Sequence, residues 1–320
     1  MTLLHAVRRL RGPGWLLAAS MALLGCGSEA PASPEDAREA SSPPRRVVVL
    51  APAAAEILDE LGQSGRVIGV GAFGPWPENL DGLPSVGGYD APNIERMLEL
   101  DCDLLVTARS DAASRSHGRI EALGIEVLAL ETSTFDGVFK SLDELGRRFA
   151  VAERAIGTER RVRDELDRVA RQTEDLGRPR VLFVVGRDPL YVAGPGSHVD
   201  ELIRIAGGEN VAGDAAEPYQ QLSMEAALRR MPEIIIDASD NRPGATLGRH
   251  AGSWGAWEFL PAVRRNRVYH VAPGRLVIPG LRLPEMARFL ARLIHPERFG
   301  EPADSSFGPL DAGRPPGAAG

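Results

Sequence analysis

Seven short runs rich in β-branched residues, arranged in two sets around a long stretch without any, strongly constrain how this chain can fold. The first set lies at residues 47–50, 66–70, 103–106 and 126–130, and the second at 181–185, 233–237 and 267–271. Segments in which apolar residues have helical spacing, such as 53–62 and 198–208, separate several of the runs. Strands that alternate with helices predict an α/β fold with mainly parallel sheets, each covered on both faces.

The stretch between the two sets has a different pattern. It shows no strand signal, and its apolar residues recur at spacings of three and four, as at Val138, Leu142, Leu145 and Phe149. This spacing predicts a helical region at 135–177. The region is longer than an ordinary globular helix, so we expect part of it to cross between an N-terminal lobe (45–134) and a C-terminal lobe (178–299).

The N-terminus carries the pattern of an export signal. A basic head with Arg8, Arg9 and Arg11 precedes the apolar run 15–24, which is too short to span a bilayer as a finished helix. The run ends in Leu-Leu-Gly-Cys, which resembles the lipobox of bacterial lipoproteins, where the cysteine becomes the acylated first residue. We therefore predict a lipoprotein signal peptide at 1–26 and a membrane anchor on Cys26, facing the periplasm or the cell exterior. The alternatives are an unlipidated signal and a short buried helix that happens to precede a cysteine.

Composition bounds the rest of the chain. Residues 27–44 have almost nothing to bury and predict a flexible tether, and the Gly-, Pro- and Ala-rich residues 300–320 predict a disordered tail. A net charge of −7 argues against a nucleic-acid partner, which would require a basic face. If Cys26 is acylated, Cys102 is the only remaining thiol, and we expect it to be buried and unreactive.

Two glutamates occupy matching places in a weak internal repeat. Glu95 lies two residues after Asn93 and eight before an acid that opens a strand run, and Glu225 has the same spacing after Ser223. Asn and Ser are favoured N-caps, so both glutamates should lie in the first turn of a helix. Acidic residues are favoured there in any helix, so capping alone is one interpretation of the pair.

Motifs for catalysis or cofactor binding are weak. Residues 69–74 match G-x-G-x-x-G, but Pro75 and Pro77 follow at once and oppose the helix start that a dinucleotide site needs. The histidines show no metal-ligand spacing, and no G-x-S-x-G motif is present. His198 should be an ordinary first-turn residue rather than a metal ligand. We therefore predict no catalytic residue, cofactor or metal, with an extracytoplasmic Rossmann-type enzyme as a less favoured alternative.

Four aromatic residues follow predicted strands or precede the second repeat helix: Phe73, Trp76, Tyr89 and Tyr219. Ligands of open α/β sheets bind beyond the carboxyl ends of the strands. Aromatic side chains with few polar groups suit a bulky, partly flat ligand. Each residue alone is more often a packing residue, but their shared placement in loops predicts a ligand cleft.

Long, ordered segments resemble the periplasmic binding proteins of cobalamin and iron-siderophore ABC importers. The segments are 46–73, 83–106, 189–212, 219–236, 262–271 and 279–296. The resemblance covers nearly all of 46–299. It implies two Rossmann-like lobes joined by one long rigid helix, a ligand cleft between the lobes, and a membrane permease as partner.

The resemblance also implies roles for particular residues. In this family a carboxylate on each lobe docks against arginines of the permease, and Glu95 and Glu225 stand at the matching places. This favours docking over capping alone, although both roles can coexist. The cobalamin branch is the most similar and implies a corrinoid ligand, with contacts from Phe73, Trp76, Tyr89, Tyr219 and Arg282.

Several positions depart from the cobalamin pattern. Tyr89 and Tyr219 stand where cobalamin binders have tryptophans, and Ala53 and Ala55 stand where family members often have Ser and Thr. Haem and ferric siderophores are therefore alternative ligands. An anionic chelate would need cations such as Arg109, Arg187 or Arg282. The sequence leaves open whether His198 or Arg109 contacts the ligand.

Overall fold

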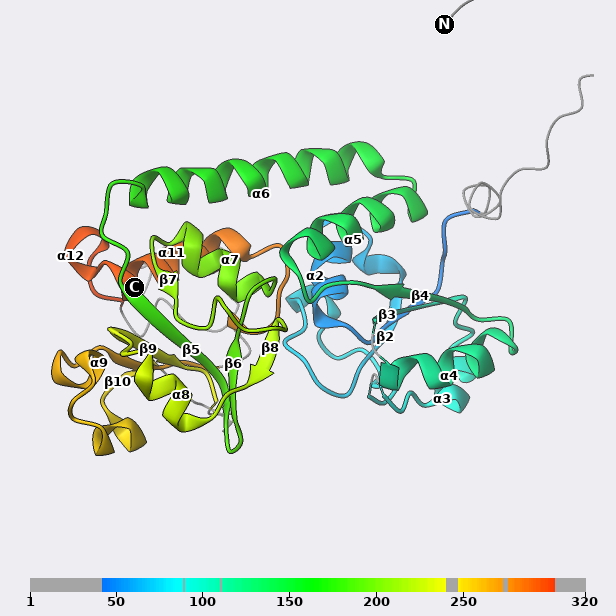
Figure 1. The fold of residues 1–320 in the computed structure, drawn as a ribbon. Coiled ribbons are helices and arrows are strands. Elements are labelled where there is room, and N and C mark those ends of the chain that lie inside the picture. Colours follow the sequence, from blue (N-terminus) through cyan, green and yellow to red (C-terminus); the bar gives the residue numbers. More distant parts are fainter. Residues whose placement is uncertain (1–41, 89, 110, 240–246, 273–275, 303–320) are drawn as a thin grey trace, which may run out of the picture. The chain divides into compact units, whose positions relative to one another are not determined.

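A computed structural model describes residues 42–88, 90–109, 111–239, 247–272 and 276–302, and Figure 1 shows the course of the chain. The predicted signal peptide, Cys26 and nearly all of the tether lie outside these residues, as do Tyr89 and most of the predicted tail. Across the part of the chain that is described, no helix combines the length and the apolar character that crossing a bilayer requires.

The first lobe is built on a parallel sheet. Its strands are β1 (Val47–Val49), β2 (Val67–Val70), β3 (Leu104–Ala108) and β4 (Glu126–Leu130), in the order β2-β1-β3-β4. All neighbouring strands in this sheet are parallel. The four predicted strands of the first set are therefore confirmed, and so is the α/β fold class.

Both faces of this sheet are covered, as the short apolar runs predict. Alternate residues of β1 enter different cores: Val47 and Val49 pack with α2 (Pro52–Glu60) and α5 (Phe135–Arg148), whereas Val48 packs with α3 (Ile94–Glu99) and α4 (Asp111–Glu121). Short 3-10 helices at Ser64–Arg66 and Glu78–Leu80 lie in the connections. No helix starts within 69–77, which agrees with the rejection of a dinucleotide site.

The second lobe contains a mixed sheet, so the prediction of mainly parallel strands holds only for part of it. The strands are β5 (Arg180–Arg187), β6 (Leu190–Ala193), β7 (Glu209–Asn210), β8 (Tyr219–Gln221), β9 (Ile234–Asp237), β10 (Gly248–Arg249) and β11 (Val268–His270). Parallel pairing joins β5 to β7 and β9, and β9 to β11. Antiparallel pairing joins β6 to β5 and β8, and β10 to β11. Tyr219 therefore begins a strand and does not lie in a loop.

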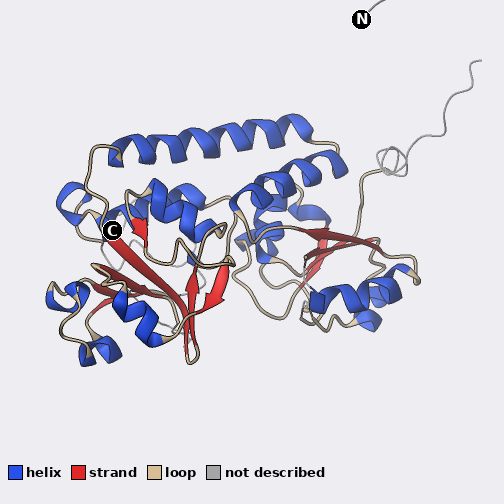
Figure 2. Cartoon of the chain, in the orientation of Figure 1, coloured by secondary structure: helices blue, strands red, loops and turns tan. Residues whose placement is uncertain are grey.

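Helices cover the two faces of the second sheet (Figure 2). They are α7 (His198–Ile205), α8 (Met224–Arg229), α9 (Pro261–Arg264), α11 (Leu283–Ile294) and α12 (Pro296–Phe299), with a 3-10 helix at Gly252–Ala256. Phe183 of β5 packs with residues of α7 and α11, and its neighbour Leu182 packs with Trp254 on the other face.

The predicted helical region consists of two helices, α5 and the 22-residue α6 (Ala152–Thr173). They are separated by a turn in which Ala150 has a positive φ of 56°. Figure 1 shows α6 running past elements of both lobes. Arg161 of α6 forms an ion pair with Glu60 of α2 (2.6 Å), and Glu165 forms one with Arg288 of α11 (2.9 Å). The longest described helix is thus attached to both lobes.

The internal repeat is visible in the backbone. Asn93 Oδ1 accepts a hydrogen bond from the Arg96 N–H, and Ser223 Oγ accepts one from the Ala226 N–H, so both predicted N-caps are confirmed. The strand-opening acids also have matching partners: Asp103 accepts from the Arg46 N–H beside β1, and Glu233 accepts from the Arg180 N–H of β5. Equivalent helix-to-strand connections therefore occur in the two lobes.

Candidate functional site

A pocket of about 400 Å³ is lined by residues from both lobes. Its lining residues are Ala108, Arg109, Glu131, Thr132, Ser133, Val185, Tyr219, Val277 and Pro279. The first five lie at or just beyond the carboxyl ends of β3 and β4, the edge where parallel sheets usually bind ligands. The others come from β5, β8 and the segment before α11.

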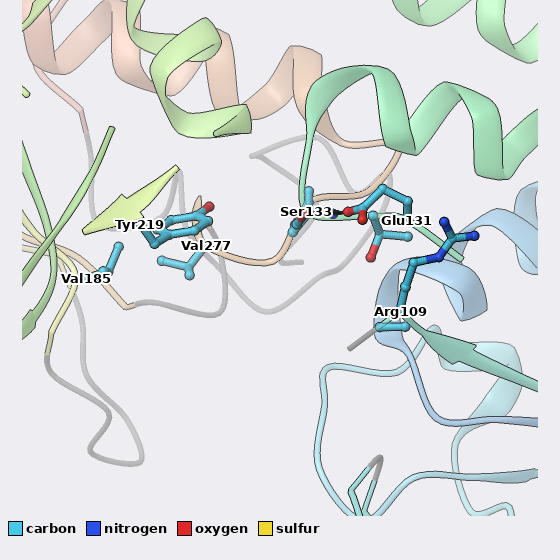
Figure 3. Close-up of a pocket in the computed structure, with 9 residues that line it drawn as sticks. Arg109, Glu131, Ser133, Val185, Tyr219 and Val277 are labelled. Atoms are coloured by element: carbon cyan, nitrogen blue, oxygen red, sulfur yellow. Dashed lines mark hydrogen bonds between the residues drawn. The ribbon is translucent and has the colours of Figure 1, made fainter. Parts of the chain in front are cut away.

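The wall from the first lobe is polar. Glu131 Oε1 accepts hydrogen bonds from the Ser133 N–H (2.9 Å) and from the Ser133 hydroxyl, and these bonds order the turn between β4 and α5. Arg109 is exposed, and its Nη2 donates to the Ala129 carbonyl at 3.3 Å. Figure 3 shows Arg109 and Glu131 near each other on one side of the pocket. This wall offers a cation, a carboxylate and a hydroxyl to a ligand.

The wall from the second lobe is apolar apart from one hydroxyl. Val185, Tyr219 and Val277 lie together in Figure 3, away from Arg109. The Tyr219 Oη lies 3.1 Å from His198 Nδ1, and burial raises the pKa of the Tyr219 phenol well above its ordinary value. Tyr219 is therefore a neutral phenol at physiological pH. An aromatic face beside two valines suits the flat, apolar part of a ligand.

His198 lies at the start of α7 behind this wall. Ser197 caps the helix by accepting from the Asp200 N–H at 3.1 Å, so the first-turn position predicted for His198 is confirmed. The imidazole is completely buried, and that burial lowers its pKa, while nearby backbone carbonyls oppose the shift. His198 does not line the pocket, but it contacts Tyr219, which does.

Some of the residues predicted to contact a ligand line the pocket, and others do not. Tyr219 and Arg109 line the pocket. Trp76 is half-buried and packs against the apolar core beside Gly71 and Gly74. Phe73, in the same loop, is 82% exposed, and neither of these two residues lines the pocket. Their contact with a ligand stays a prediction.

Arg282 is engaged by a carboxylate of the first lobe. Its Nε donates to Glu56 Oε1 at 3.1 Å, and both side chains are 23% exposed. Burial raises the pKa of Glu56 and outweighs the opposing attraction of Arg282. Arg282 begins the segment that leads into α11, and Glu56 lies on α2. The pair therefore connects the two lobes.

Arg187 is likewise engaged within the second lobe. It forms an ion pair with the buried Asp237, which also accepts from Trp254 Nε1 (2.8 Å) and from the Ser239 N–H (3.1 Å). Burial alone would raise the pKa of Asp237, but the hydrogen bonds from Ser239, Trp254 and Arg187 lower it overall. Of the three cations considered for an anionic ligand, only Arg109 lines this pocket.

Glu131, Thr132, Ser133, Val185 and Val277 line the pocket but were not predicted as site residues. Glu131 to Ser133 directly follow the predicted strand at 126–130. The rule that ligands bind beyond the carboxyl ends of parallel strands, applied to every strand, would have identified these three. Nothing in the local sequence distinguishes Val185 and Val277 from ordinary core residues.

The two glutamates of the repeat are exposed in the first turns of their helices, Glu95 in α3 and Glu225 in α8. Glu225 forms a surface ion pair with Arg229 at 3.0 Å. Both side chains are therefore accessible to another molecule.

The remaining candidates for chemistry are not assembled into a centre. Cys102 is buried and free, and burial raises its thiol pKa to about 11, so the predicted unreactive thiol agrees with its surroundings. Within the described ranges, no three His, Cys, Asp or Glu side chains are grouped so that they could hold a metal ion.

Comparison with known proteins gives the family. The profile of the family described as periplasmic binding protein matches residues 47–273, well over half of the chain. The chain belongs to the periplasmic binding protein family. These are solute-binding proteins of transport, which deliver small molecules to a membrane permease.

Individual relatives agree with this family. A vitamin B12-binding protein of Vibrio parahaemolyticus is 25% identical over 72% of this chain and 82% of its own length. An ABC transporter substrate-binding lipoprotein of Bacillus subtilis is 26% identical over 89% of this chain and 97% of its own. The crystal structure of a periplasmic heme-binding protein from Pseudomonas aeruginosa has a TM-score of 0.68 and 26% identity, covering 80% and 94% of the two chains.

Proposed function

We propose that this periplasmic binding protein is a lipid-anchored receptor that captures a corrinoid and delivers it to an ABC importer. The observation that carries the proposal is the pocket itself, which combines an apolar, aromatic wall from one lobe with polar side chains from the other. A corrinoid has the same two characters, a flat apolar ring and a rim of polar amides. The similarity to vitamin B12-binding proteins supports this ligand class.

Titration of the chain with cyanocobalamin tests the ligand. We expect saturable binding at or below micromolar ligand, together with a rise in thermal stability, because a ligand that binds only the folded state stabilises it. The Tyr219→Ala variant, which removes the aromatic ring from the pocket, should bind more weakly. Absence of binding by the unchanged chain at micromolar cyanocobalamin would rule out the corrinoid.

Haem or a ferric siderophore is the second candidate, and Arg109 is the observation that favours it. An exposed guanidinium on the pocket wall can pair with a ligand carboxylate. The similarity to a heme-binding protein of known structure adds to this alternative. Competition between haemin and cyanocobalamin, measured with the unchanged chain and with Arg109→Gln, separates the two. Loss of haemin binding alone in Arg109→Gln would assign the cation to an anionic ligand.

We further propose that Glu95 and Glu225 dock on the permease. Both are exposed and hold equivalent places in the repeat, so one carboxylate of each lobe could contact a two-fold transporter. Exposed charges at a rim mainly steer and orient such an encounter. Charge reversal of both residues to lysine should abolish uptake and leave ligand affinity unchanged. Lysine substitution of the exposed Glu153 and Glu209 is the matched control, and it should preserve uptake.

The membrane anchor on Cys26 completes the proposal. A tethered receptor has a raised effective concentration near a membrane-bound partner. In Cys26→Ser, we expect the protein to be found in the soluble fraction after export, and the lipid mass to be absent from its N-terminus. Unchanged membrane association of this variant would contradict the anchor without affecting the ligand.

A further inference from the structure

One buried imidazole contacts both walls of the pocket. His198 Nδ1 lies 3.1 Å from Tyr219 Oη and 3.4 Å from the Ser133 carbonyl oxygen, and its Nε2 lies 2.9 Å from the Leu276 carbonyl oxygen. Tyr219 and Ser133 line the pocket, and Leu276 immediately precedes the lining residue Val277. The ring itself is 0% exposed. His198 thus acts on the pocket from behind, through the residues that line it.

The partners fix where the protons lie. The Leu276 oxygen can only accept a hydrogen bond, so Nε2 must carry a proton. Burial disfavours the charged form of the imidazole and lowers its pKa below the ordinary value, so the ring is neutral at physiological pH and Nδ1 has a lone pair. The atom that can donate to Nδ1 at 3.1 Å is the Tyr219 hydroxyl. The Ser133 oxygen, at 3.4 Å from Nδ1, receives no proton from the neutral ring.

We propose that His198 is a positioning residue that holds the Tyr219 proton, so that Tyr219 offers a ligand only oxygen lone pairs. The inference rests on the proposed function and deepens it. A phenol can both donate and accept, but a phenol whose single proton is already used can only accept. The pocket would then favour ligands with N–H groups at this wall over ligands with carboxylates there.

This preference separates the two candidate ligand classes. The rim of a corrinoid carries primary amides, whose N–H groups can donate to the Tyr219 oxygen. The propionates of haem are ionised carboxylates that only accept, and they would face a lone pair at this place. His198 would therefore act as a specificity determinant for an amide rim. The structural alternative is that the imidazole only fills space beneath α7.

The proton arrangement can be measured without any ligand. In the full chain labelled with 15N-histidine, the His198 signal, assigned by its absence in His198→Asn, should show a protonated Nε2 and an unprotonated Nδ1. Tyr219→Phe, which removes only the hydroxyl, should shift the Nδ1 resonance and leave the Nε2 resonance in place. A protonated Nδ1, or an Nδ1 resonance indifferent to Tyr219→Phe, would overturn the proposal.

Ligand selectivity is the second readout. In His198→Leu the phenol proton is released, so the preference for cyanocobalamin over haemin should fall about 3- to 10-fold, the effect of one neutral hydrogen bond. His198→Asn keeps an oxygen near the Nδ1 position and should retain the preference. In a Tyr219→Phe background the two His198 variants should have the same preference. An equal loss in His198→Leu with and without the Tyr219 hydroxyl would show that His198 only supports the fold, contrary to the proposal.

The two proposals fail in different ways. If the wild-type protein does not bind cyanocobalamin, the corrinoid function is refuted. The role of His198 is then tested by the NMR measurement alone. If cyanocobalamin binds but the preference is the same in His198→Leu as in the unchanged chain, the function stands and the positioning role is refuted.

Discussion

The ion pair between Arg282 and Glu56 leads to a prediction about what Arg282 does. The sequence resemblance implies that Arg282 contacts the ligand. In the structure, however, Arg282 Nε lies 3.1 Å from Glu56 Oε1 in the other lobe and forms an ion pair with it. Glu56 also accepts a hydrogen bond from the Leu281 backbone, so the carboxylate is held at two points. Arg282→Ala should therefore weaken the connection between the lobes and leave the binding of ligand largely unchanged.

The expected loss follows from the surroundings of the pair. A hydrogen bond to a charged group contributes about 1.5–3 kcal/mol, and both side chains are only 23% exposed, so solvent screens the pair little. Arg282→Ala should lower the free energy of unfolding by about 1.5–3 kcal/mol. In a double-mutant cycle with Glu56→Ala, the two losses should be less than additive by about 1 kcal/mol or more. Urea unfolding measures both.

A matched control is available on the surface. Arg161 of α6 forms an ion pair with Glu60 of α2, but these side chains are 50% and 40% exposed. Arg161→Ala should cost about 0.5 kcal/mol or less, as exposed pairs do. If Arg282→Ala instead leaves stability unchanged and weakens ligand binding tenfold or more, then Arg282 contacts the ligand and does not serve to join the lobes.

Three further predictions concern single sites. A Cβ on Gly280 would overlap Glu56 Oε2, so Gly280→Ala should displace the carboxylate and destabilise the protein by about 1–3 kcal/mol in urea unfolding. Burial holds the pKa of His198 below its ordinary value, so the unfolded chain takes up the proton first. Stability should decrease as the pH falls below about 6.5, and less steeply in His198→Leu, when unfolding is followed at pH 7.5 to 5. Phe73→Ala should change stability by about 0.5 kcal/mol or less, because the side chain is 82% exposed; a clear loss of ligand affinity in the same variant would place Phe73 against the bound ligand.

The sequence predicted the buried part of the fold well because burial leaves a strong pattern. All seven β-branched runs form strands, since strands covered on both faces must be apolar throughout. The antiparallel part of the second sheet was not predicted. In β8 the sequence is Tyr-Gln-Gln, and these residues are at most half-buried, so neither composition nor alternation identifies a strand there. Its pairing with β6 depends on the tertiary fold.

The candidate site was predicted only in part, for a related reason. Tyr219 lines the pocket, and it could be predicted as a site residue because an aromatic residue stands out in a polar segment. The partner of a charged residue is not visible in the sequence, and 226 positions separate Arg282 from Glu56. In the same way, the sequence around His198 indicates only an ordinary first-turn residue, and its contacts with Ser133 and Leu276 come from segments 65 and 78 residues away.

The repeat between the lobes gives a last prediction. Glycine substitutions at two equivalent positions, which have the same backbone conformation, should change the stability of the protein differently. Asp101 and Met231 each lie six residues after the glutamate of their repeat, and each has a positive φ of 47°. A left-handed conformation costs a side-chain-bearing residue about 1 kcal/mol, while glycine adds about 0.4–1 kcal/mol of entropy to the unfolded chain.

Exposure then decides the sign of the effect. Asp101 is exposed, so Asp101→Gly should be neutral or slightly stabilising, whereas Asp101→Ala, which keeps the backbone cost, should be less stable by comparison. Met231 packs against the core beside Leu182, so Met231→Gly gains the same relief but loses about 1–2 kcal/mol of apolar burial. Urea unfolding of the three variants measures these differences. Equal losses in both glycine variants would mean that the backbone conformation at these two positions carries no strain, and that the repeat is one of sequence spacing without a shared energetic cost.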